Sequence, residues 1–374
     1  MTPTDELHLA YRTTDHLAAL LRAWDAGVAD EGPLARHRWT DLALWPAARS
    51  ATVAGSTGIE GNPLRAVDVE AVLAGGTPDA GPRAHPADIR DVLNYNRALD
   101  LANRAALRPD FEWSQELLRR LNATILDGLE DDTGGEYRAG PVTVGGAYAP
   151  PEAARLPRLM SHLEAWLRDD DGSEHTLIRA GLAHLNVVSI HPWLNGNGRS
   201  ARVVGSLAVM RRGIAAPELV NVESWIREHA GDYVAALQAA HGPDYRPADH
   251  SATPWLEFFA QVSVDRLELR NRLLAAASTD LGLLVITLEA AREPLAWAPI
   301  LLASAMGPVR TSALAGALDL SSARVRSMLA SMVAAGWLAT VGDRRGRSYL
   351  AGGRLEDLSL RSPSIMDRLR AGAP

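Results

Sequence analysis

The stretch HPWLNGNGRSAR, which runs from His191 to Arg202, contains the densest group of candidate functional residues in the chain. The proline that follows His191 predicts that a preceding helix stops there and that His191 has an extended backbone. Gly196 and Gly198 allow positive φ angles and a close approach of the backbone to a ligand. A second helix is expected to begin near Gly198, so the stretch predicts a helix, a tight loop and another helix.

The residues of this loop fit the chemistry of phosphate binding. Backbone N–H groups in such a loop converge with the N-terminus of the next helix to form an anion site. Arg199 and Arg202 share one face of that helix, and guanidinium groups suit phosphate oxygens. His191 lies at the mouth of the loop, and its ordinary pKa of about 6.5 leaves it mostly neutral near pH 7. A lone histidine, a pair of arginines or a glycine turn is usually structural, but together they indicate a phosphoryl-type transfer site with a base beside it.

Composition excludes several other classes of protein. The 374 residues carry a formal net charge of −7, and the length predicts about two or three domains. Without cysteine there are no disulfides or thiolate nucleophiles. All 38 basic residues are arginine, so Walker A, protein-kinase and Schiff-base sites, which need lysine, are excluded. No signal peptide is apparent, and the uncharged stretches 295–309 and 327–342 are too short to cross a bilayer. We expect a cytoplasmic protein without a membrane segment.

Most of the chain has the periodicity of amphipathic helices. Apolar residues recur at spacings of three and four, as in Leu118, Leu121 and Ile125. Further helical stretches are expected near 14–27, 66–74, 87–107, 152–168, 176–189, 199–212, 223–237 and 254–277. The segment 135–151, GEYRAGPVTVGGAYAPP, instead alternates valines between glycine pairs, which is typical of a short β-hairpin. The fold class is therefore mainly α.

The C-terminal part has a different pattern. Residues 311–350 read as a helix, a tight turn, a second helix and a two-stranded wing, the order of a winged helix. Six arginines and two aspartates between 308 and 350 give this segment a local charge of +4 in an acidic chain. Arg324 and Arg326 would lie on the recognition helix, and Arg344, Arg345 and Arg347 on the wing, where they could meet DNA phosphates. Because the charge is modest, docking of a target or dimerisation is favoured over DNA binding.

The stretch quoted first resembles the signature of the Fic family, H-x-F-x-[D/E]-G-N-G-R-x-x-R. Most Fic enzymes transfer AMP from ATP to a hydroxyl group of a target protein. The resemblance implies that His191 is the general base. It also implies that Asn197 and the amides of Gly196 and Gly198 contact the α-phosphate and oxyanion, while Arg199 and Arg202 hold the β- and γ-phosphates.

The sequence departs from the Fic signature at two positions. Trp193 replaces a phenylalanine that packs in the core, which is a mild change. Asn195 replaces the acidic residue that holds Mg²⁺. An amide oxygen can ligate magnesium but contributes no charge, so we expect Asn195 to be a weak metal ligand. Its presence leaves open a different nucleotide preference or the transfer of a phosphate.

A second motif, STGIEGN at 56–62, resembles the inhibitory helix of the Fic family, [S/T]-x-x-x-E-[G/N]. Ser56, Glu60 and Gly61 match it. A carboxylate in a last helical turn opposes the helix dipole and needs a nearby cation, and the resemblance implies that Glu60 pairs with Arg202 and blocks the γ-phosphate position. The motif precedes the signature, as in Fic proteins with a built-in N-terminal inhibitor. Gly55 and Gly58 are poor helix formers and favour a short or labile helix.

The hairpin at 135–151 resembles the Fic flap, although an ordinary exposed hairpin has the same pattern. An unpaired flap edge can add an extended target segment as another strand, and Thr143 and Tyr148 are candidates for target contact. His184 and His191 are seven residues apart and could share a metal with His175, but no carboxylate has matching spacing. A structural role is therefore favoured for His184.

The resemblance implies an organisation for the whole chain. Residues 1–105 are the N-terminal helical region with the inhibitory motif, residues 106–270 the Fic core, and residues 280–352 the winged helix. The implied function is a self-inhibited protein adenylyltransferase that uses ATP and Mg²⁺, acts on a Ser, Thr or Tyr hydroxyl or on itself, and self-associates. A winged-helix DNA-binding regulator with a nucleotide-sensing core is the alternative. The sequence names neither the target nor any reverse reaction.

Overall fold

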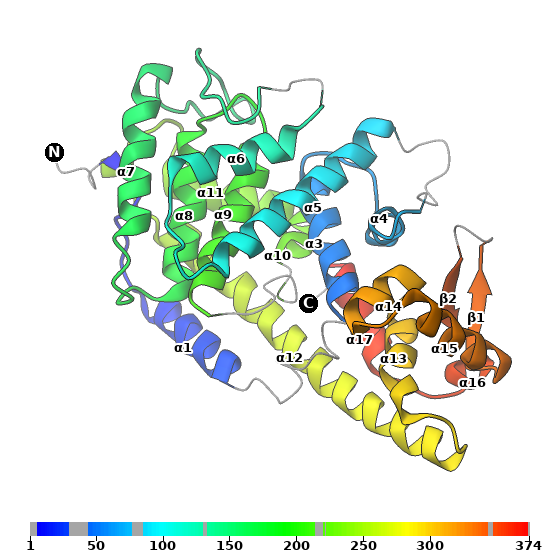
Figure 1. The fold of residues 1–374 in the computed structure, drawn as a ribbon. Helices are drawn as coiled ribbons and strands as arrows, with labels where there is room; N and C mark the ends of the chain where they lie inside the picture. The colour runs from blue at the N-terminus through cyan, green and yellow to red at the C-terminus, as the bar shows by residue number, and fades with distance from the viewer. Residues whose placement is uncertain are drawn as a thin grey trace.

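The computed structural model is a helical bundle that continues into a small C-terminal domain with one β-hairpin (Figure 1). It describes residues 6–29, 44–76, 85–129, 133–213, 220, 222–342 and 347–372. The predicted mainly α fold class is confirmed: among these residues the only sheet has two strands.

The described residues of the N-terminal part contain the helices α1 (Asp15–Ala29), α3 (Trp45–Ile59), α4 (Ala66–Leu73) and α5 (Pro86–Ala106). Proline occupies a first-turn position in both α3 and α5, where its missing N–H costs no hydrogen bond. The glycines within α3 do not shorten it. A Cβ at Gly55 would lie 2.6 Å from the backbone of Glu223, and one at Gly58 would meet Arg227. Both glycines therefore allow α3 to pack closely against Glu223 and Arg227. Helix α3 has 15 residues, so the expectation of a short helix is wrong.

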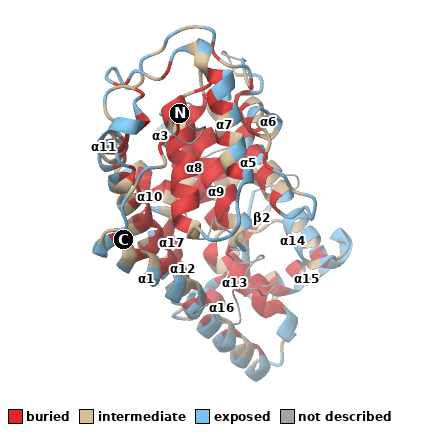
Figure 2. Cartoon of the chain, turned by 90° about the vertical axis from the view of Figure 1, so that its left-hand side faces the viewer, coloured by how far each residue is buried: buried red, intermediate tan, exposed pale blue. Residues whose placement is uncertain are grey.

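The central part of the bundle surrounds α8 (Figure 2). Its helices are α6 (Gln115–Leu126), α7 (Leu156–Arg168), α8 (Thr176–Ile190), α9 (Asn197–Arg211), α10 (Val222–Glu228), α11 (Ala230–His241) and α12 (Thr253–Ala290), with 3₁₀ turns η4 (Ala153–Arg155) and η6 (Pro247–Asp249). A further 3₁₀ turn, η7 (Leu295–Trp297), follows α12, and its Trp297 lies in the core of the C-terminal part. Nearly every side chain of α8 is buried, as expected of a helix that is apolar on most sides. The stretch predicted as one helix over 223–237 is divided at His229, which lies between α10 and α11.

Helix α12 connects two hydrophobic cores. Its first half contributes Trp255 and Leu256 to the core of the bundle, and its second half contributes Leu284 and Leu288 to the C-terminal core. It runs to Ala290 instead of the predicted 277 because the apolar pattern continues into the second core. By length and composition α12 could cross a membrane, a test that a core helix also passes.

The C-terminal part begins with α13 (Ala298–Met306), α14 (Thr311–Leu318) and α15 (Ser322–Ala334). Strands β1 (Leu338–Val341) and β2 (Ser348–Ala351) then pair antiparallel, with Leu338 opposite Ala351. This is the order of elements predicted for a winged helix. Helices α16 (Gly353–Glu356) and α17 (Ser362–Arg370) follow, and α17 packs against both α12 and α3.

Helix α3 belongs to both cores. Leu44, Ala47 and Ala48 at its beginning lie in the C-terminal core, whereas Val53 and Ala54 lie in the core of the bundle. Figure 1 shows α3 between α5 and α17. The helix that carries the inhibitory motif is therefore packed on several sides.

Candidate active site

The loop between α8 and α9 is closed by two residues with left-handed backbones. Helix α8 stops at Ile190 as predicted, but His191 has φ 50° and ψ 57°, so the extended backbone expected from Pro192 is wrong. The His191 N–H still donates to Val187 O at 3.1 Å, which completes the last turn of α8 and reverses the chain. Gly196 has φ 76°, and α9 begins at Asn197.

The side chain of Asn197 organises the loop from inside. Its Oδ1 accepts from Trp193 N at 3.1 Å and its Nδ2 donates to Trp193 O at 2.8 Å. Trp193 is fully buried, as expected from the residue it replaces. Because Asn197 is buried and engaged with Trp193, its side chain is not directed at a ligand. The side chain of Asn197 thus shapes the loop, and contact with the α-phosphate stays a prediction for the backbone N–H groups of Gly196 and Gly198.

Glu60 occupies the space above the first turn of α9. A Cβ placed on Gly198 would lie 2.6 Å from Glu60 Oε1. The partial positive charge at a helix N-terminus attracts anions. The carboxylate therefore sits where the sequence predicts that a phosphate would bind.

Arg202 bonds two residues of the motif at 56–62, Glu60 and Ser56. Its guanidinium donates to Glu60 Oε1 at 2.9 Å, to Ser56 Oγ at 2.7 Å and to Ser56 O at 3.0 Å. The Arg202 side chain is 2% exposed, whereas that of Glu60 is 36% exposed. Burial alone would raise the pKa of Glu60, but the charge and hydrogen bond of Arg202 lower it below its usual value. Glu60 is therefore charged and more accessible than its partner.

Arg199 has a different carboxylate partner. Its Nη1 donates to Asp91 Oδ1 of α5, and Asp91 also accepts from Asn62 Nδ2 at 3.0 Å. Sequence reasoning missed Asp91 because it lies far from either motif in the chain. Both arginines of the signature are thus paired with carboxylates.

His191 is held in one orientation. Its Nδ1 lies 3.2 Å from Val188 O, an acceptor that requires the proton on Nδ1 and leaves Nε2 with a free lone pair. Burial lowers the pKa of His191 to about 4, although the Val188 carbonyl opposes the shift. The imidazole is therefore neutral near pH 7 and able to accept a proton at Nε2.

Comparison with known proteins identifies this loop. Residues 112–209 match the family model described as Fic/DOC family. This part of the chain, which includes the loop between α8 and α9, is therefore similar to the Fic/DOC family. A protein adenylyltransferase Fic of Aedes aegypti is 30% identical over 213 residues, 56% of this chain and 41% of that protein. One of Drosophila virilis is 31% identical over 193 residues, 51% of this chain and 38% of that protein.

Solved structures share the fold. A Fic family protein of Desulfovibrio desulfuricans aligns with a TM-score of 0.60 and 23% identity, covering 92% of this chain and 98% of that one. A Fic domain containing signaling protein of Bacteroides thetaiotaomicron aligns with a TM-score of 0.56 and 21% identity, covering 70% of this chain and 98% of that one. The chain spans less than half the length of the curated relatives it matches.

Two buried residues hold the loop between α8 and α9. Asn122 of α6 donates to Asn195 O at 3.0 Å and accepts from Gly135 N at 2.9 Å. Arg138 donates to His191 O at 2.8 Å, to Gly140 O at 2.8 Å and to Pro151 O. The sequence shows GEYR as part of a hairpin but gives no signal that its arginine reaches the signature loop.

The segment 135–151 contains a turn rather than a paired hairpin. Its only antiparallel bridge joins Val144 to Tyr148. Tyr148 is 5% exposed, its hydroxyl donates to Ser189 O at 2.8 Å, and its ring packs on His241. The prediction that Tyr148 contacts a target is therefore wrong. Thr143 is exposed, and its target contact stays a prediction.

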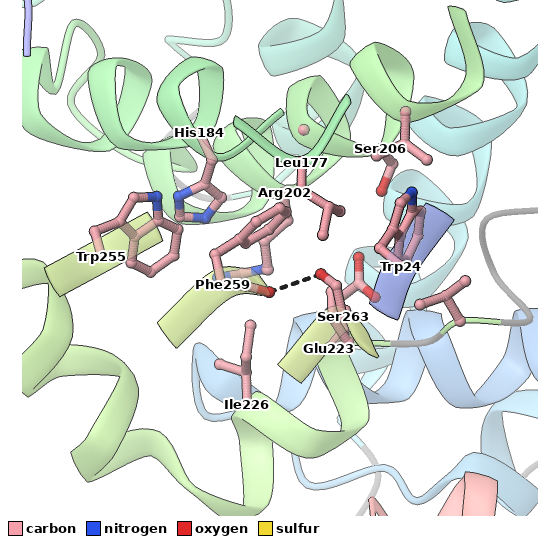
Figure 3. A pocket seen from close by; sticks show the side chains of 14 residues that line it. Trp24, Leu177, His184, Arg202, Ser206, Glu223, Ile226, Trp255, Phe259 and Ser263 are labelled. Atoms are coloured by element: carbon pink, nitrogen blue, oxygen red, sulfur yellow. Dashed lines mark hydrogen bonds between the residues drawn. The ribbon is translucent and has the colours of Figure 1, made fainter. Parts of the chain in front are cut away.

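A small cavity lies behind Arg202 (Figure 3). Its volume of about 40 Å³ suits roughly one water molecule. His184 stacks on Trp255 with 4.7 Å between ring centroids, and burial lowers the pKa of His184 to about 3. His175 instead caps α8 and faces Asp25. The predicted structural role of His184 is thus supported, since a neutral ring backs Arg202.

The described residues contain no group of three His, Asp or Glu side chains arranged for a metal. Asn195 is partly exposed in the signature loop. The nearby carboxylates of Glu60 and Asp91 are both paired with arginines. In the C-terminal part, Arg324, Arg326 and Arg347 are exposed, while Arg344 and Arg345 lie outside the described residues.

Proposed function

We propose that this chain is a protein adenylyltransferase that transfers AMP from ATP to a hydroxyl group of a target protein and is inhibited by its own Glu60. The observation that carries the proposal is the Glu60 carboxylate at the N-terminus of α9, paired with Arg202 at 2.9 Å. An anion of this chain occupies an anion site beside a neutral histidine. The curated relatives named protein adenylyltransferase Fic support the same reaction.

In the proposed reaction, Nε2 of His191 accepts the proton of the target hydroxyl. The hydroxyl oxygen forms a bond to the α-phosphorus, and the bond from that phosphorus to the bridging oxygen of the β-phosphate breaks. Pyrophosphate leaves with the electron pair. The Val188 carbonyl contributes by fixing the tautomer of His191, as a general base requires.

The phosphates would be held by the first turn of α9. Backbone N–H groups after Gly196 point toward the α-phosphate, and their donors would stabilise charge that develops during transfer. Arg199 and Arg202 would bind the β- and γ-phosphates. Since the Glu60 carboxylate is paired with Arg202, a triphosphate would have to displace it before the γ-phosphate could bind Arg202.

Magnesium fits the site as a companion of the nucleotide. Mg²⁺ is usually held by one or two protein oxygens, phosphate oxygens and water. The Asn195 amide could provide one oxygen, and bound Mg²⁺ would neutralise charge on the leaving pyrophosphate. The absence of a carboxylate at position 195 predicts weak metal binding.

The target would dock beside the segment 135–151, close to exposed Thr143. Modification of a second copy of the chain, self-association and a cytoplasmic location belong to the same proposal. The exposed Arg324 and Arg326 on α15 support the alternative of DNA binding, which would appear as salt-dependent affinity for duplex DNA.

Incubation with Mg²⁺ and ATP labelled on either the α- or the γ-phosphate tests the reaction. Wild type and Glu60→Gly would be compared by intact mass, with His191→Ala as the inactive control. Label from the α-phosphate only, stronger in Glu60→Gly, is expected. Label from the γ-phosphate only would mean phosphate transfer, and no label with bound nucleotide would favour the sensor alternative.

A further inference from the structure

The two arginines of the signature are paired with carboxylates that differ in exposure and in their other hydrogen bonds. Glu60 follows the last turn of α3, and its side chain is 36% exposed. Asp91 lies within α5, a helix of 21 residues, and its side chain is 13% exposed. Both Asp91 oxygens accept hydrogen bonds, one from Arg199 and one from Asn62. Glu60 is therefore the more accessible of the two carboxylates, and Asp91 is the one bonded through both oxygens.

Asn62 connects Asp91 to the turn that carries Glu60. Its Nδ2 donates to Asp91 Oδ2 and to Asp88 O, both at 3.0 Å. Its Oδ1 accepts from Leu64 N at 3.1 Å, and its backbone N–H donates to Thr57 O at 3.1 Å. The amide is 7% exposed and bonded through both of its polar atoms. The turn at 60–62 is therefore fixed against α5 as well as against α3.

Arg199 keeps donors for a ligand while it is bound to Asp91. Its Nε is buried and has no hydrogen-bond partner within the described part of the chain. A buried N–H without a partner is costly, and a phosphate oxygen would satisfy it. Asp91 thus holds one edge of the guanidinium and leaves another for an anion.

We propose that Asp91 and Asn62 are positioning residues: Asp91 orients Arg199 for phosphate binding, and Asn62 ties Asp91 to the turn that places Glu60 on Arg202. The inference rests on the proposed function. It adds that Asp91 supports nucleotide binding while Glu60 opposes it, although each residue pairs with an arginine of the same helix. Loss of the two carboxylates should therefore have opposite effects.

The first test is the affinity for ATP and for inorganic triphosphate, measured by calorimetry in the Glu60→Gly background. Asp91→Asn should weaken both about tenfold, a loss of about 1.4 kcal/mol. In labelled-ATP assays it should raise the KM for ATP and change kcat little. Asp88→Asn is the matched control, because the Asp88 side chain bonds His85 N and not Arg199, and it should leave both affinities unchanged.

The second test asks whether Asn62 acts on nucleotide binding through the placement of Glu60. Asn62→Ala should tighten ATP binding in the otherwise wild-type chain. This gain should be absent in the Glu60→Gly background, where no carboxylate at position 60 is left to place and only the bond of Asn62 to Asp91 is lost. Equal effects in both backgrounds would overturn the role of Asn62. Thermal melting and circular dichroism would verify that each variant is folded.

The outcomes distinguish this inference from the proposed reaction. If Asp91→Asn binds triphosphate more weakly than its parent but no AMP is ever transferred, the positioning role stands and the proposed reaction fails. If AMP is transferred and Asp91→Asn binds triphosphate as well as its parent, or more tightly, the positioning role is wrong.

Discussion

At the scale of single residues, the pairing of Glu60 with Arg202 is the feature that the sequence predicted most fully. The resemblance of the two motifs to those of the Fic family implied both partners, and helix-end electrostatics added only that the carboxylate needs a nearby cation. Asp91 and Arg138 were not predictable in the same way. Asp91 reaches the site through its contact with Arg199, and Arg138 through its contact with His191 O. Neither residue lies in a motif from which its partner could be predicted.

The Asn197 and Tyr148 predictions failed for a common physical reason. A polar side chain in a functional motif can be directed at a ligand or at the backbone that forms the site. Both residues bond to backbone groups of the signature loop or of α8. Buried polar groups need such partners, and sequence alone does not show where those partners lie.

His191 should act as a base over a wide range of pH. Its pKa is lowered from 6.5 to about 4 by burial, and the base acts when neutral, so activity is kept above the folded pKa and lost as pH falls through it. We expect kcat/KM for ATP in Glu60→Gly to be nearly level from pH 8 to 6 and to fall toward pH 4. A midpoint near 6.5 that depends on His191 would contradict this assignment.

Helix α3 illustrates what sequence reasoning misses at the scale of an element. Glycine lowers helix propensity, so Gly55 and Gly58 favoured a labile helix. Tertiary packing reverses that conclusion, because α10 approaches too closely for any side chain. Ser224 Oγ of α10 also donates to Ala51 O at 3.0 Å. Arg202 holds α3 as well, through Ser56 Oγ and Ser56 O.

Gly55→Ala should destabilise the protein. The added Cβ would lie 2.6 Å from backbone atoms of Glu223 and Ser224, and overpacking of this kind costs about 1–3 kcal/mol. Gly282→Ala in α12 is the matched control, since its Cβ would meet nothing within 4 Å and should stabilise the helix by up to about 1 kcal/mol. Chemical denaturation measures the free energy of unfolding of both variants. An unchanged midpoint for Gly55→Ala would show that α10 shifts to accept the added Cβ at little cost.

At the scale of the whole molecule, the order of the elements was predictable but the way the parts join was not. Periodicity identified the bundle and the helix, turn, helix and wing of the C-terminal part. It did not show that α12 runs through both cores or that α3 begins in one core and ends in the other. Such contacts join residues far apart in the chain, where no local pattern records them.

The shared helix α3 links the C-terminal part to the active site. Arg370 of α17 donates to Glu70 of α4 at 3.0 Å and to Met306 O at 2.6 Å. The turn at 60–62 is therefore part of a continuous packed structure. We propose that Glu60 blocks the site by occupying the place of the terminal phosphates.

The most direct measurement compares the affinities for ATP and AMP by calorimetry in His191→Ala, with and without Glu60→Gly, so that no nucleotide is consumed. Loss of Glu60 should tighten ATP binding at least about tenfold, or about 1.4 kcal/mol, and leave AMP binding unchanged, because AMP has no phosphate that reaches Arg202. Equal affinity for ATP in both proteins, or an equal gain for AMP, would contradict the claim.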